Sequence, residues 1–92
     1  MKSGIELISI ERKEQIEKHG YDLHHDVNVN NEGELHRAAV IIIDAEHNGI
    51  EDWQRLEWNK KMYLKIVNKT RIEQLAIAGA LIAAEIDRLQ AS

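Results

Sequence analysis

Four glutamates of this 92-residue chain have the residue type and spacing that metal chemistry requires. Glu11 and Glu14 lie three residues apart in a segment of helical character, so they share one face of a helix. Glu34 opens a second helical segment, and Glu85 follows a long apolar run. Helical bundles hold Mg²⁺ with carboxylates from facing helices, together with the phosphates of a substrate. Glu11, Glu34 and Glu85 are therefore candidate magnesium ligands.

The same carboxylates also have a structural interpretation. Glu34 lies three residues after Asn31, the spacing of a capping box at a helix start. Glu11 and Glu85 each interrupt an apolar neighbourhood, where a salt bridge is the alternative to metal ligation. The arginines considered as partners are Arg12, Arg37 and Arg88.

A polar connection at residues 20–31 carries further candidates for ligand contact, because connections of this length inside a small domain are often functional. Its adjacent histidines, His24 and His25, point in opposite directions if the backbone is extended, and no His-x-x-x-His pair is present. We expect His25 and Asp26 to make polar contacts with a ligand, or to form hydrogen bonds within the loop and at a helix cap, rather than to hold a transition metal. The candidate ligand-binding residues of the whole chain are Glu11, Arg12, Gln15, Tyr21, His25, Asp26, Glu34 and Glu85.

The aromatic residues allow two interpretations. Trp53 and Trp58 could stack a nucleobase, since every base offers a π face. In a chain without phenylalanine they are more simply explained as bulky core residues. The sequence has no glycine-rich phosphate loop, no Gly-x-Ser-x-Gly elbow and no cysteine, which excludes P-loop nucleotidases, α/β-hydrolases and thiol enzymes.

Length and composition predict one domain spanning residues 1–92, with self-association to enlarge a small core. The formal charge of −4 makes nucleic acid an unlikely main ligand, although Lys60, Lys61, Lys65, Lys69 and Arg71 are clustered. No signal peptide and no apolar run of membrane-spanning length are present, and there are no cysteines. We therefore expect a cytoplasmic protein without membrane contact.

The pattern of apolar residues predicts an all-α fold, a compact bundle of three to four helices. The first helix is expected at residues 5–19, with Ser3 and Glu6 as its capping box. A second is expected to begin at Asn31 and to stop at Asn48-Gly49. A third is expected over 51–67, with a possible break near Trp58-Asn59.

The last predicted helix follows a Thr70-x-x-Glu73 capping box and continues to Leu89. It is composed mainly of Ala, Gly, Leu and Ile. Small residues let neighbouring helices approach closely, so this helix is expected to be the central packing element.

The chain resembles a family of small uncharacterised proteins from phages and prophages. The resemblance rests on five motifs in order: E-R-x-x-Q at 11–15, a Gly-aromatic pair at 20–21, His-Asp at 25–26, G-E-L-x-x-A-A at 33–39 and A-G-A-L-I-x-A-E-I-x-R at 78–88. Family members usually carry a second Asp where this chain has Val27, and a Lys where it has Ile77.

A looser analogy is with MazG-like all-α nucleotide pyrophosphohydrolases, which hold Mg²⁺ with E-x-x-E on one helix and E-x-x-D on a later one. Glu11-x-x-Glu14 matches the first motif, whereas no E-x-x-D occurs.

Three functional hypotheses follow from the sequence. The first is a non-catalytic, homo-oligomeric module that binds a nucleotide or a host protein. The second is a magnesium-dependent pyrophosphohydrolase using Glu11, Glu34 and Glu85, and the third is a helical protein whose polar residues only join its helices. No cofactor is required except Mg²⁺ in the second hypothesis.

Overall fold

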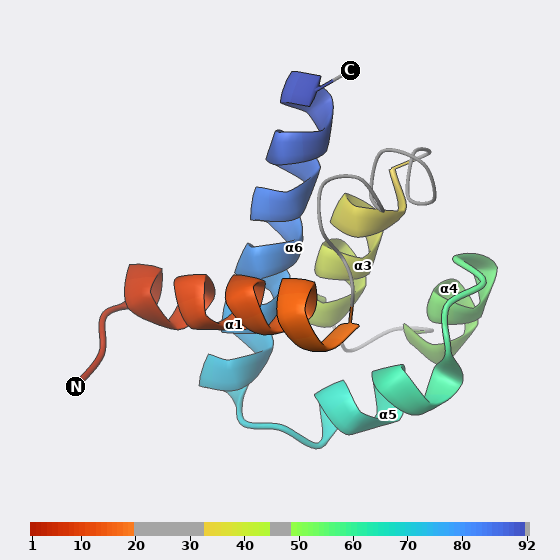
Figure 1. Cartoon of the computed structure of the whole chain (residues 1–92). Coiled ribbons are helices and arrows are strands. Elements are labelled where there is room, and N and C mark those ends of the chain that lie inside the picture. The colour runs from red at the N-terminus through yellow and green to blue at the C-terminus, as the bar shows by residue number, and fades with distance from the viewer. Residues whose placement is uncertain (20–32, 45–48, 92) are drawn as a thin grey trace.

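The computed structural model describes residues 1–19, 33–44 and 49–91, and all regular structure in these ranges is helical. The prediction of an all-α fold is confirmed, with five helices in the described ranges (Figure 1). They are α1 (Gly4–His19), α3 (Glu34–Ile43), α4 (Gly49–Arg55), α5 (Lys60–Val67) and α6 (Arg71–Ala91). The predicted connection with Tyr21, His25 and Asp26 lies outside the described residues.

Helix α6 is the central element, as its small residues predict. It packs against α3 and against α1, and both neighbours approach its alanines closely. The Thr70 hydroxyl accepts a hydrogen bond from the Glu73 amide at 3.2 Å and donates one to the Glu73 carboxylate at 3.0 Å. The hydroxyl therefore caps the helix start and lowers the pKa of Glu73.

Helix α1 crosses α6 at a steep angle (Figure 1) and begins at the predicted capping box. The Glu6 amide donates to the Ser3 hydroxyl at 3.2 Å, and the Ser3 amide donates to the Glu6 carboxylate at 3.3 Å. At the crossing, a Cβ on Gly79 would lie 2.6 Å from Cδ1 of Ile8. The missing side chain of Gly79 is what lets the two helices meet.

Helix α3 begins later than predicted. Its N-cap is Gly33, whose φ of 88° is left-handed and which offers no side-chain cap. Glu34 is therefore the first residue of the helix and not the third, so the expected capping-box role of Glu34 is wrong. The helix also ends at Ile43, before the predicted stop at Asn48-Gly49.

Gly49 opens α4 instead of terminating the preceding helix. It is buried, and a Cβ on Gly49 would lie 2.1 Å from the Tyr63 hydroxyl oxygen and 3.0 Å from Cζ of the same ring. The glycine that looked like a helix stop provides the space in which Tyr63 packs.

The predicted break in the third helix is confirmed, and it separates α4 from α5. Glu57 adopts a left-handed φ of 62°, and the Asn59 side chain caps α5 by accepting from the Lys61 amide at 2.7 Å. Trp53 is fully buried and donates from Nε1 to the Asn59 carbonyl at 3.0 Å. Trp58 packs edge-on against Trp53 at 5.3 Å between ring centroids.

Gly49→Ala is expected to lower the free energy of unfolding by about 1–3 kcal/mol, because the rigid Tyr63 ring cannot make room for a methyl group without shifting. Gly4→Ala is the matched control, since no atom lies within 4 Å of its Cβ position. Its effect should stay within about 0.5 kcal/mol. Urea denaturation measures both, and equal effects would contradict this role of Gly49.

Candidate functional site

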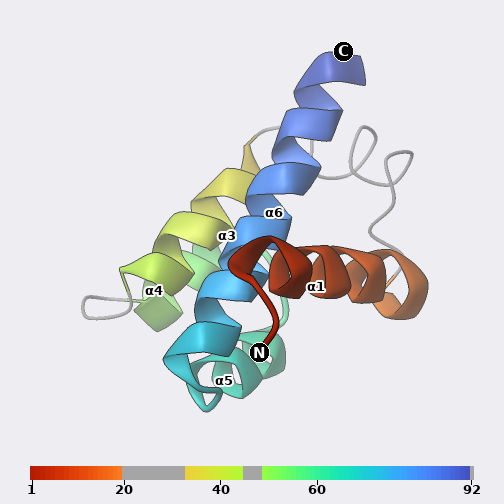
Figure 2. The ribbon, with the colours of Figure 1, turned by 90° about the vertical axis from the view of Figure 1, so that its left-hand side faces the viewer.

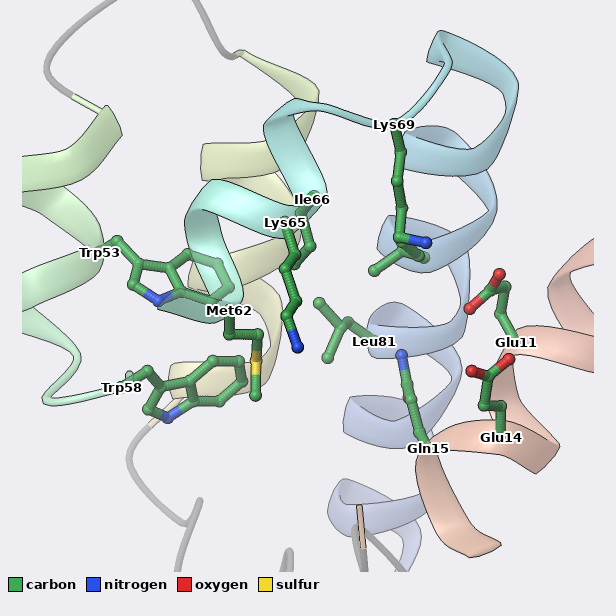
Figure 3. Close-up of a pocket in the computed structure, with 11 residues that line it drawn as sticks. Glu11, Glu14, Gln15, Trp53, Trp58, Met62, Lys65, Ile66, Lys69 and Leu81 are labelled. Carbon is green, nitrogen blue, oxygen red and sulfur yellow. The ribbon is translucent and has the colours of Figure 1, made fainter. Parts of the chain in front are cut away.

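A pocket of about 260 Å³ lies between α1, α5 and α6 (Figure 3). It is lined by residues from every described helix except α3, together with two residues from the links on either side of α5. These residues are Glu11, Glu14, Gln15, Trp53, Trp58, Met62, Lys65, Ile66, Lys69, Ile77 and Leu81.

The body of the pocket is apolar. Trp53, Ile66, Ile77 and Leu81 are buried core residues, so this part of the wall is held rigidly by the packing of the whole domain. The indole of Trp58 and the side chain of Met62 are half-buried at the same wall. A flat, apolar group could enter here and be covered on several sides.

Charged side chains of opposite sign line opposite walls of the pocket. Glu11 and Glu14 project from α1, whereas Lys65 projects from α5 and Lys69 from the link between α5 and α6 (Figure 3). Glu14 also pairs with Lys18 at 3.6 Å, and Lys69 pairs with Glu73 at 3.7 Å. The pocket therefore offers anionic groups on one side and cationic groups on the other.

Gln15 is the buried polar residue of the pocket. It is only 7% exposed, and its side chain points from α1 toward Leu81 (Figure 3). Its amide oxygen is buried and accepts no hydrogen bond from any residue that the structure describes. Leaving such an atom without a partner costs about 1–3 kcal/mol. A hydrogen-bond donor that reached this oxygen would recover that loss.

Glu85 lies at a second polar site, between α3 and α6. Its carboxylate accepts a hydrogen bond from the Arg88 guanidinium and lies 2.8 Å from Nδ1 of His36. The carboxylate is 7% exposed and the Arg88 side chain 13%. The Arg88 hydrogen bond lowers the pKa of Glu85 by more than burial raises it. The salt bridge to Arg88 that the sequence offered as an alternative is present.

Arg12 belongs to the contact between α1 and α6 and is not one of the residues that line the pocket. Its side chain is 13% exposed, and Nη2 lies 4.0 Å from the Asp87 carboxylate. Glu34 is half-buried at the first turn of α3. Of the eight candidate ligand-binding residues, the structure brings Glu11 and Gln15 to one pocket.

The described residues contain no group of three His, Asp or Glu side chains that could hold a metal ion. Glu11, Glu34 and Glu85 therefore do not form the three-carboxylate cluster that the magnesium hypothesis requires.

None of the helices in the described ranges has the length and apolar character needed to cross a membrane.

Sequence reasoning missed several pocket residues, among them Met62, Lys65, Lys69 and Leu81. Met62 and Leu81 carry the same helical spacing as ordinary core residues, so periodicity could not separate pocket wall from core. The run of lysines was a usable signal, because Lys65 and Lys69 are four residues apart and can reach the same side.

Glu85→Ala is expected to lower the free energy of unfolding by about 3 kcal/mol at neutral pH, because the largely buried Arg88 guanidinium loses its ion pair with Glu85. Asp87→Ala is the control, and it should cost less than about 1 kcal/mol because its carboxylate is half exposed.

The stabilisation by Glu85 should also depend on pH. Since folding lowers the pKa of Glu85, the difference between wild type and Glu85→Ala is complete above the ordinary glutamate value of about 4.3. It shrinks as the pH falls through that value toward the lowered one. Denaturation at several pH values measures it, and a difference that grows in acid would contradict the assignment.

Comparisons with known proteins do not assign the chain to a family: no family model, no curated protein and no solved structure matches it at a significant level. The resemblance to small phage proteins stays a prediction from the motifs, and the function has to be argued from the pocket.

Proposed function

We propose that this protein is a binding module for a small molecule, and that its ligand is a nucleotide held in the pocket between α1, α5 and α6. The observation that carries the proposal is the Gln15 amide, which is buried in the pocket wall and whose oxygen accepts no hydrogen bond from the residues that the structure describes. A stable fold tolerates such a group where a ligand completes it.

The apolar wall suits a nucleobase. Trp58, Met62 and Leu81 offer an indole ring and flexible apolar side chains against which a base can pack. The Gln15 amide carries both a donor and an acceptor, so it can pair with the polar edge of a base. At about 260 Å³ the pocket is smaller than the roughly 300–1,000 Å³ of typical drug-sized sites, which fits a base with the rest of the ligand at the mouth.

The charged walls suit the two other parts of a nucleotide. Lys65 and Lys69 can neutralise phosphate oxygens on one side. Glu11 and Glu14 repel phosphate but can accept hydrogen bonds from the hydroxyls of a ribose, a role that acidic residues fill in dinucleotide sites. The opposed charges would therefore orient the ligand, with its sugar toward α1 and its phosphate toward α5.

Binding is favoured over magnesium-dependent hydrolysis by the positions of the carboxylates. Hydrolysis in the form considered needs Glu11, Glu34 and Glu85 around one ion, but the described residues hold no such group and Glu85 is engaged by Arg88 and His36. We further propose a cytoplasmic, self-associating protein of the phage type, as the sequence suggests.

Gln15→Leu tests the proposal because it should lower the affinity for the ligand without lowering the stability of the fold. Loss of one neutral hydrogen bond, about 1–1.5 kcal/mol, should raise the Kd for AMP or ATP about tenfold in isothermal titration calorimetry. The free energy of unfolding should stay the same or rise by about 1 kcal/mol, since an unpaired buried oxygen disappears. Gln54→Leu, an exposed glutamine outside the pocket, is the control and should change neither quantity.

Two further measurements test the phosphate contact and the absence of hydrolysis. Lys65→Gln should weaken the binding of ATP more than the binding of adenosine, because only ATP carries phosphate. The same titrations with Mg²⁺, followed by analysis for released pyrophosphate, distinguish binding from hydrolysis. Wild-type protein that binds neither adenosine nor its phosphates would overturn the proposal, as would equal affinity of wild type and Gln15→Leu.

A further inference from the structure

The outer face of α6 carries a stripe of large, partly exposed aliphatic residues, which the described helices leave open except at Gly79, where Ile8 of α1 lies against α6. Ile72, Leu75, Ile82, Ile86 and Leu89 are 67%, 45%, 41%, 51% and 57% exposed. With Gly79 they recur at alternating steps of three and four residues, the spacing that places side chains along one side of a helix. No charged residue interrupts the series over its six positions.

Helix α3 extends this face on one side. It lies antiparallel to α6, because His36 near its start meets Glu85, whereas Arg71 at the start of α6 donates to the carbonyls of Ile42 and Ile43 at its end. His36, Val40 and Ile43 share one side of α3 at steps of four and three. Val40 is 56% exposed and Ile43 is 42% exposed.

The two helices are visible side by side in Figure 2, with α1 packed to the other side of α6. The buried alanines Ala76 and Ala80 belong to the side of α6 away from the stripe. The outer face thus consists of two antiparallel helices with seven large aliphatic side chains, which are Val40, Ile43, Ile72, Leu75, Ile82, Ile86 and Leu89.

We propose that a second copy of this chain docks on the outer face of α3 and α6, so that the two pairs of helices form a four-helix bundle. Two antiparallel helices with one apolar face are half of such a bundle, and an identical pair supplies the other half through a twofold axis. The face is self-complementary in character, since it is apolar along its centre and carries its charges, Arg71 and the Glu85 group, at its edge.

The exposed apolar area approaches what each partner buries in a standard dimer. The seven side chains leave on the order of 600 Å² of apolar surface open, at the upper end of the largest patches on monomers and close to the roughly 800 Å² that each partner buries in a standard interface. The pocket lies on the opposite side of α6, at the contact with α1 and α5, so docking does not close it. The proposal does not depend on the nucleotide.

Analytical ultracentrifugation of wild type and two matched variants tests the proposal. Wild type should sediment at twice the chain mass of 10.6 kDa and dissociate on dilution. Ile82→Glu places a charge at the centre of the face and should weaken dimerisation at least about 30-fold. Leu64→Glu changes an aliphatic residue of α5 with almost the same exposure, 40% against 41%, and should leave the dimer intact.

Two measurements keep the test independent of folding. Circular dichroism should show equal helix content for wild type and Ile82→Glu, because the side chain is already half exposed. The melting temperature of wild type should rise with protein concentration, and that of Ile82→Glu should not. A monomeric wild type at every concentration would overturn the proposal. So would a dimer weakened equally by both variants, or a monomer that instead binds a different protein through this face.

Discussion

The structure depends on how closely two helices can approach α6. Alanines fill the buried sides of this helix, and Gly79 removes even the methyl group where α1 crosses. Close approach is what gives a short chain a dense core, because dispersion contacts fall away steeply with any gap. It also fixes the directions of α1 and α3 relative to α6, and therefore the positions of every polar side chain they carry.

The pocket is a consequence of that arrangement. α1 crosses α6 steeply, so its second half, with Glu11, Glu14 and Gln15, extends past α6 toward α5. The tryptophans at the break between α4 and α5 form the far wall, with Trp53 locked by its hydrogen bond to the Asn59 carbonyl. A space bounded by rigid core residues and edged by charges is suited to bind one small ligand in one orientation.

The side of α6 away from the pocket carries the contacts with α3 and an exposed apolar surface. Glu85 is held there by Arg88 and His36, which ties α3 to α6 near one end, while Arg71 ties them at the other. With both ends fixed, α3 and α6 present a flat apolar face. One helix thus supports an apolar pocket with charged edges on one side and a hydrophobic surface on the other, and a protein of this size gains stability if both are filled.

The sequence by itself determined the helical fold and the starts of α1 and α6, because capping and helical periodicity are local, whereas the predicted bounds of α3 were wrong. Ser3, Thr70 and the break before Asn59 were all correctly identified from it. It also marked α6 as central and Glu85 as a carboxylate in need of a partner. Only the tertiary structure decided that Gly49 makes space for Tyr63, that Glu11, Glu34 and Glu85 are not grouped, and that Gln15 meets Lys65 and Lys69 at one pocket. These outcomes depend on crossing angles between distant segments, which no local pattern encodes.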